Sequence, residues 1–97
     1  MATFVSLANW TDQGVRTFKE STKRADAFAR MVKKHGGTVT AIYWTIGAYD
    51  VVSVIEAPDD ETVAAIALQV AALGNIRTTT MRAFTEKEFT AIVGRTG

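Results

Sequence analysis

The sequence predicts a single α+β domain with the element order βαββαβ and one more helix at the C-terminal end. Two observations predict this fold class. Runs rich in β-branched and aromatic residues alternate with stretches whose apolar residues recur at helical spacing, and glycine, proline or capping residues separate them. The chain has 97 residues, of which 47% are hydrophobic, enough for one core but not two. We therefore expect residues 1–97 to form one domain.

The first half begins with a strand over residues 2–10. Thr11 is expected to cap one long helix, whose apolar positions repeat from Val15 to Val32 opposite a basic face. This helix should end at residues 33–37, KKHGG, where cations and glycines suit a helix C-terminus. Its expected core side consists of Val15, Phe18, Thr22, Ala25, Phe28, Ala29 and Val32.

Two strands are then expected to form a hairpin, over residues 38–46 and 49–57. Only Gly47 and Ala48 separate them, which predicts a two-residue type II′ turn. This turn would place one set of side chains on one face: Ile42, Trp44, Ile46, Tyr49, Val51 and Ile55. The opposite face would carry Val39, Ala41, Tyr43, Thr45, Asp50, Val52, Val54 and Glu56.

Capping residues mark the elements of the second half. Pro58 ends the hairpin, and Asp59 or Asp60 should cap a second helix that Gly74 closes. Residues 75–84 are expected to be the fourth strand. The spacing of Thr85 and Glu88 predicts a capping box that opens a short last helix. The expected apolar positions of the two helices are Val63, Ile66, Ala67, Val70 and Leu73, and then Phe89, Ile92 and Val93.

This element order is that of the ferredoxin-like plan. Right-handed crossovers predict a four-stranded antiparallel sheet of order 4-1-3-2 with both long helices on one face. Because both faces of the hairpin carry apolar residues, the face without helices needs a cover. The expected cover is a second copy of the chain, in a homodimer through the sheet face or in a higher oligomer.

Composition excludes several classes of function. Eleven Lys and Arg against ten Asp and Glu give a net charge of +1, which argues against a nucleic-acid partner. No cysteine is present, so disulfides and thiolate metal sites are excluded, in keeping with a cytoplasmic location. We expect no signal peptide and no membrane partner, since the longest apolar run is far shorter than the roughly 20 residues of a span. A transcriptional sensor is disfavoured because no helix-turn-helix precedes the domain.

A short motif around the hairpin carries a family resemblance. Gly47-x-Tyr49-Asp50, followed by an aliphatic strand that ends in Glu56-Ala57-Pro58, resembles the GYD-domain family. That family is similar to dimeric α/β-barrel proteins, which implies ferredoxin-like sheets paired face to face. Its broader relatives include cofactor-free oxygenases, isomerases and amino-acid-sensing domains, so the resemblance does not decide the activity. Further matching segments are Thr11-x-x-Gly14, His35-Gly36-Gly37 and residues 77–84.

Asp50 and His35 are the candidate catalytic residues, each with a structural alternative. Asp50 either fixes the hairpin register or acts as a general base with Tyr43 or Tyr49 as hydrogen-bond donor; the structural interpretation is favoured. His35 is either a solvated cation at a helix end, which is favoured, or a second acid–base group. With one histidine and no cysteine, we expect no metal site, and no cofactor is implied.

Ligand-binding candidates are the aromatic and charged residues of the strands. Arginine is suited to hold a carboxylate or phosphate at a cleft, although cross-strand or interface pairs are the more common role. These candidates are Trp44, Glu56, Arg77 and Arg82. The favoured function is a non-catalytic homo-oligomeric module that binds a small molecule in a sheet–helix or dimer cleft. The alternative is a cofactor-free oxygenase or isomerase that uses Asp50 with a tyrosine or His35.

Overall fold

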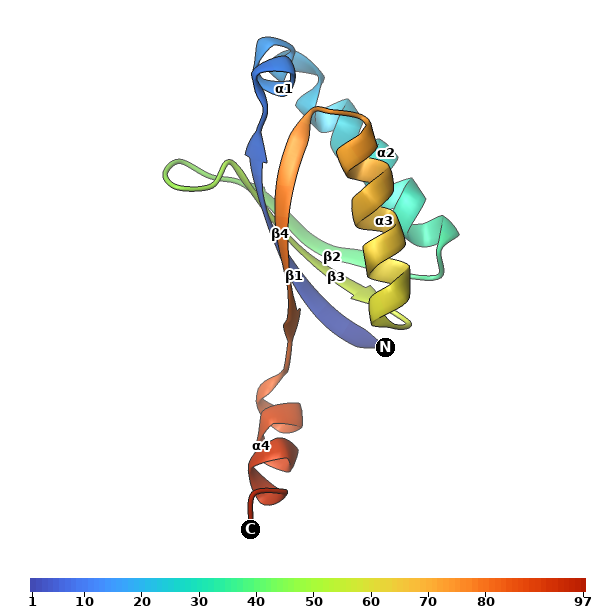
Figure 1. Cartoon of the computed structure of the whole chain (residues 1–97), viewed down its shortest axis with the longest axis vertical. Coiled ribbons are helices and arrows are strands. Elements are labelled where there is room, and N and C mark those ends of the chain that lie inside the picture. The colour runs from blue at the N-terminus through green and yellow to red at the C-terminus, as the bar shows by residue number, and fades with distance from the viewer.

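The structure, a computed structural model, describes residues 1–97 (Figure 1). In chain order the elements are β1 (Ala2–Trp10), α1 (Asp12–Arg16), the 3₁₀ turn η1 (Phe18–Glu20), α2 (Ser21–Lys34), β2 (Thr38–Trp44), β3 (Val51–Ala57), α3 (Asp60–Ala72), β4 (Ile76–Ala83) and α4 (Glu86–Gly94). No helix has both the length and the apolar character that crossing a bilayer requires.

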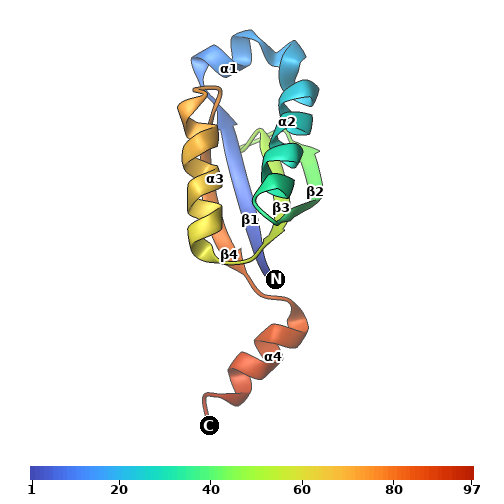
Figure 2. The ribbon, with the colours of Figure 1, turned by 90° about the vertical axis from the view of Figure 1, so that its right-hand side faces the viewer.

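The four strands form one antiparallel sheet in the order β2-β3-β1-β4. Read from the other edge, this is the strand order expected from the sequence. Helices α2 and α3 lie on the same face of the sheet, and the opposite face carries no helix (Figure 2). The core lies between these two layers, in two clusters of buried residues: Phe4, Ile55, Ala57 and Val63; and Val32, Ile66 and Val70.

The expectation of one long first helix is wrong, because the chain breaks at Thr17. Thr17 leaves helical geometry, and its amide donates to the carbonyl of Gly14 at 3.3 Å. Gly14 is held against the α3–β4 loop, where a Cβ would come within 1.9 Å of the Asn75 carbonyl oxygen. This contact turns α1 away from the axis of α2. As a result Val15 and Phe18, expected in the core, are exposed.

The hairpin differs from the prediction in its turn and in one bulge. The pairs Trp44–Val51 and Tyr43–Val52 are confirmed, but residues 45–50 form a loop instead of a two-residue turn. The Thr45 amide closes that loop on the Asp50 carbonyl at 2.9 Å. A register shift between residues 39 and 41 moves Val39 to the helix side, where it packs on a core cluster.

The predicted caps are confirmed. Asp59 caps α3 and accepts from the Thr62 amide at 2.8 Å and from the Thr62 hydroxyl at 2.6 Å, which lowers the pKa of the Asp59 carboxyl. Thr85 and Glu88 form both bonds of the capping box of α4. The bond from the Thr85 amide lowers the pKa of Glu88. Helix α4 projects away from the two layers, beyond the end of the sheet (Figures 1 and 2).

Candidate functional site

A row of hydroxyl side chains crosses the middle of the helix-facing side of the sheet. Strand register places Ser53 of β3, Ser6 of β1 and Thr80 of β4 side by side. Ser6 and Ser53 are buried, and the Thr80 hydroxyl donates to the Ser6 oxygen at 3.3 Å. The row is a polar feature within a mostly apolar layer. A buried hydroxyl is costly unless it has a hydrogen-bond partner.

A cleft lies above this row, between the sheet and the two long helices. Its volume is about 160 Å³, and 15 of its 21 lining residues are hydrophobic. The walls include Phe28 and Met31 of α2 and Ile66 and Val70 of α3, while Ser6 and Thr80 contribute from the sheet. A dry cavity of about 150 Å³ holds one benzene ring, so this cleft fits a ring-sized apolar group.

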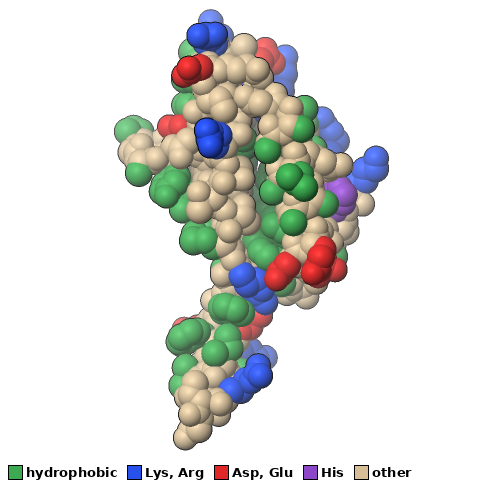
Figure 3. Space-filling view, viewed as in Figure 1, with side chains coloured by type: hydrophobic (Ala, Val, Ile, Leu, Met, Phe, Trp, Pro, Cys, Tyr) green, Lys and Arg blue, Asp and Glu red, His purple; other side chains and the backbone are tan.

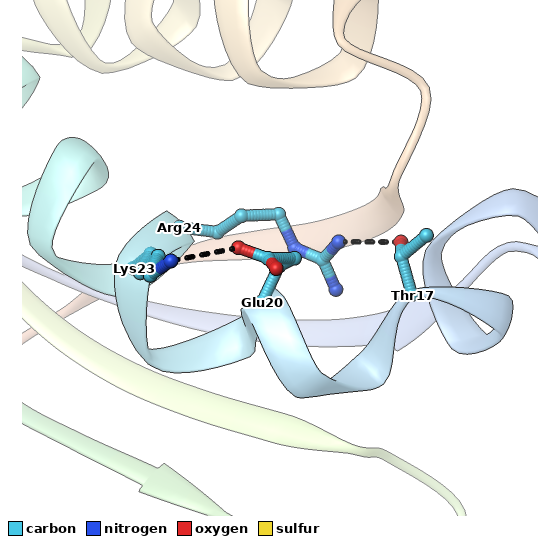
Figure 4. A network of polar contacts seen from close by, with 4 residues as sticks. All are labelled: Thr17, Glu20, Lys23 and Arg24. Atoms are coloured by element: carbon cyan, nitrogen blue, oxygen red, sulfur yellow. Dashed lines mark hydrogen bonds and ion pairs between the residues drawn. The ribbon is translucent and has the colours of Figure 1, made fainter.

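Arg24 lies at one end of the cleft and is the only charged residue of its lining. The Arg24 guanidinium donates to the Thr17 hydroxyl at 2.9 Å, to the Gly14 carbonyl at 3.1 Å and to the Ser21 hydroxyl at 3.4 Å. Figure 4 shows the Arg24 side chain reaching from α2 toward Thr17. Ser21 and Asn75 also line the cleft. Sequence reasoning missed Arg24 because it belongs to a helix rich in basic residues, where nothing distinguishes it from its neighbours.

Asp50 closes its own hairpin only through its backbone carbonyl, and its amide and carboxylate join β3 to β1. Its amide donates to the Ala8 carbonyl at 2.8 Å, and its carboxylate accepts from the Trp10 amide at 2.9 Å. Asp50 therefore continues the pairing of β3 with β1 beyond their last strand pair, Ala8 with Val51. The carboxylate is half-buried, and no tyrosine or histidine donates to it.

His35 and the two tyrosines do not converge on Asp50. The His35 ring bonds to the Gln69 side chain at 3.1 Å, near the end of β3 opposite Asp50. Seven residues of strand separate the two ends, a span of about 20 Å. Tyr43 is exposed on the face without helices, and Tyr49 accepts only at its backbone carbonyl, from Thr45.

The ligand-binding candidates are likewise dispersed. Trp44 lines the cleft. Arg82 donates to the carbonyls of Thr3 and Ala83, and its guanidinium lies 4.5 Å from the centre of the Phe84 ring. Arg77 and Glu56 pair with opposite ends of β1, so about 20 Å separates them. No group of three or more His, Asp or Glu side chains is placed to hold a metal.

The sheet face without helices, called the open face below, is apolar. Alternation along the paired strands assigns its central residues. They are Val5, Leu7, Tyr43, Val52, Val54 and Met81, together with the polar Thr79, which pairs with Leu7. Tyr43 is 63% exposed and Met81 44% exposed, and the four aliphatic residues are only half-buried.

Comparison with known proteins decides the family. The GYD domain family matches residues 4–93. The chain belongs to the GYD domain family. It is 36% identical over 84 residues, 86% of this chain and 88% of the relative, to a Thermus thermophilus protein named glutamine synthetase and cystathionine beta-lyase binding protein.

Solved structures share the fold of this GYD-family chain. The crystal structure of TTHA0845 from Thermus thermophilus matches with a TM-score of 0.56 and 23% identity, covering 88% of this chain and 95% of that one. The 5-chloro-2-hydroxyhydroquinone dehydrochlorinase of Burkholderia phenoliruptrix matches with a TM-score of 0.63 and 13% identity. The match covers 88% of this chain and 96% of that one. These neighbours fit a dimeric α/β-barrel fold, and at such identities the likeness concerns the fold alone.

Proposed function

We propose that this GYD-family chain is a non-catalytic homodimeric module that holds a small, largely apolar molecule in the cleft between its helices and its sheet. The cleft carries the proposal. Its walls are apolar and its floor bears hydroxyls, the usual make-up of a small-molecule site. Arg24 is the only lining residue with an ionisable side chain. No carboxylate, histidine or lysine therefore lines the cleft to act as a general base.

Native mass spectrometry of the protein purified from its own host tests the cleft. We expect a carried small molecule that dissociates on denaturation. Ala67→Leu, which fills the cleft, should abolish this adduct. Ala72→Leu adds the same volume at an exposed position outside the lining and should keep it. An adduct that survives Ala67→Leu, or a wild-type protein without any adduct, would contradict the proposal.

The open face is proposed as the dimer interface, in the face-to-face manner of a ferredoxin-like pair. Four strands about 4.8 Å apart and about seven residues long span a flat area of roughly 440 Å². A standard interface buries about 800 Å² of accessible surface per partner, and the flat area of this face is about half of that. Helix α4 would extend the interface, because its hydrophobic side chains, among them Phe89 and Val93, are exposed (Figure 3).

Light scattering at low micromolar concentration tests the dimer. We expect about twice the chain mass of 10.5 kDa. A 10.5 kDa species would contradict the proposed dimer. Val54→Asp places a charge on the open face and should give folded monomers. Leu68→Asp places the same charge on the outer side of α3, where Leu68 is 72% exposed, and should leave the dimer intact.

A protein partner is the second candidate function, and the named relative supports it. That protein binds glutamine synthetase and cystathionine beta-lyase by its name, and it is similar to this chain over 84 residues. We propose that the dimer likewise docks on metabolic enzymes of the cytoplasm. Interferometry with purified glutamine synthetase and cystathionine beta-lyase from the same host tests this. Absence of binding to both at micromolar concentrations would contradict it.

The alternative of a cofactor-free oxygenase or isomerase would centre on Asp50 with a tyrosine or His35. The geometry favours it less, since the Asp50 carboxylate already bonds to the Trp10 amide and His35 lies at the other end of β3. Turnover of a small aromatic or keto substrate that Asp50→Asn abolishes, without loss of stability, would favour the enzyme.

A further inference from the structure

Arg24 places a positive charge at the end of an apolar cleft without an acidic partner. All three of its hydrogen bonds go to neutral oxygens. The structure contains one ion pair, between Lys23 and Glu20 at 3.6 Å, and both of those side chains are exposed. Figure 4 shows that pair beside Arg24. Arg24 itself makes no direct ion pair with any carboxylate of the chain.

The guanidinium also keeps free donors. An arginine side chain has five N–H groups, and three of these are used here. The two unused N–H groups are that of Nε and one of Nη1, because both hydrogens of Nη2 go to Gly14 and Ser21. A half-buried cation with free donors favours an anionic acceptor such as a carboxylate, which would accept a charge-assisted hydrogen bond. Since no lysine or second arginine lines the cleft, the site balances one negative charge and not the two of a phosphate monoester.

We infer that the ligand of the cleft is a small monocarboxylate whose apolar part has the size of one ring, with Arg24 as the anchor for its carboxylate. This inference rests on the proposed function and names the class of ligand. The apolar part would lie among Phe28, Met31 and Ile66, and the carboxylate would lie at the Arg24 end beside Ser21 and Asn75. The hydroxyls of the floor would receive a polar substituent on the far side of the ring.

Benzoate and benzyl alcohol are matched probes for this inference, because they share the ring and differ in charge. Titration followed by amide NMR shifts on the full chain should show tighter binding of benzoate than of benzyl alcohol. Arg24→Gln should weaken the affinity for benzoate by about tenfold or more, the usual effect of losing charge-assisted hydrogen bonds. The affinity for benzyl alcohol should stay within about twofold of the wild-type value. Arg30→Gln, which removes an exposed charge from the same helix outside the cleft, should change neither.

Two further variants separate binding from folding, since Arg24 also holds the α1–α2 junction. Thr17→Val removes one structural partner of Arg24 and should leave benzoate affinity within about twofold. Arg24→Lys keeps the charge but carries it on a compact ammonium instead of a planar guanidinium. It should weaken the affinity for benzoate several-fold while the fold persists. In the wild type, benzoate should shift the amides of Ser21 and Asn75 most strongly.

The outcomes distinguish the inference from the proposed function. If benzyl alcohol binds in the cleft and Arg24→Gln or Arg24→Lys binds benzoate as tightly as the wild type, the inference is overturned and the cleft stands as a neutral site. If benzoate shifts only the amide signals of residues on the open face, the inference is also overturned. If neither probe binds the wild type, both the inference and the proposed cleft fail.

Discussion

Asp50→Ala is expected to loosen the junction of β1 and β3. The substitution removes the carboxylate that accepts from the Trp10 amide at 2.9 Å, while the Asp50 amide can still donate to Ala8. Hydrogen bonds to a charged group contribute about 1.5–3 kcal/mol. Asp50→Asn keeps an uncharged acceptor, whose bond contributes about 0.5–1.5 kcal/mol, so the loss in that variant should be about 1 kcal/mol.

These values convert to measurable shifts in thermal unfolding. For a domain of this size, 1 kcal/mol corresponds to about 4–8 °C in Tm. We therefore expect Asp50→Ala to lower Tm by about 6–24 °C and Asp50→Asn by about 4–8 °C. Circular dichroism at one fixed protein concentration is the assay, because self-association makes Tm depend on concentration. Asp26→Ala, which removes an exposed carboxylate on α2 that makes no side-chain hydrogen bond, is the matched control and should not lower Tm.

An unchanged Tm for Asp50→Ala would refute the structural role of this carboxylate. The alanine and asparagine variants also separate the two interpretations of Asp50. A structural carboxylate predicts graded losses of stability in the order wild type, asparagine, alanine. A general base predicts equal loss of turnover in both variants, whatever their stability.

Three further predictions concern the glycine contact and the caps. Gly14→Ala should lower the denaturant midpoint, because its Cβ would meet the Asn75 carbonyl at 1.9 Å and force α1 away from the α3–β4 loop. Thr85→Ala should reduce the helical circular dichroism of α4, since it removes the hydroxyl that accepts from the Glu88 amide at 3.2 Å, and an unchanged spectrum would contradict the cap. The lowered pKa of Asp59 means that its stabilisation is present above its ordinary pKa of 3.8 and is lost as pH falls through the lower folded value. Thr62→Val should flatten that acid dependence, measured as urea midpoints between about pH 2 and 6.

The elements and their order could be predicted because local signals determine them. Asp59 and Thr85 cap the helices that follow them, and alternating apolar residues assign the strands to faces. The break at Thr17 could not be predicted, because it depends on the packing of Gly14 against Asn75, which lies in the second half of the chain. Helical periodicity describes one helix at a time and contains no information on such a contact.

The site was harder to predict than the fold for a similar reason. Asp50 stands out because of its motif, but its partner is an amide 40 residues earlier, in another strand. Arg24 occupies a position typical of a solvated helix face, and only the turn between α1 and α2 brings Thr17 and the Gly14 carbonyl within its reach. A sequence pattern identifies residue types, whereas a cleft depends on which elements meet.

Strand alternation connects the two proposed binding surfaces more closely than their position on opposite faces suggests. Ser6 of β1 lies on the floor of the cleft, and its chain neighbours Val5 and Leu7 lie on the open face. A ligand that shifts β1 therefore acts one residue away from the proposed dimer contact. If the ligand strengthens dimerisation by some factor, thermodynamic linkage requires that dimerisation strengthen ligand binding by the same factor. Such a module would report the concentration of a small carboxylate through its own assembly, without catalysis.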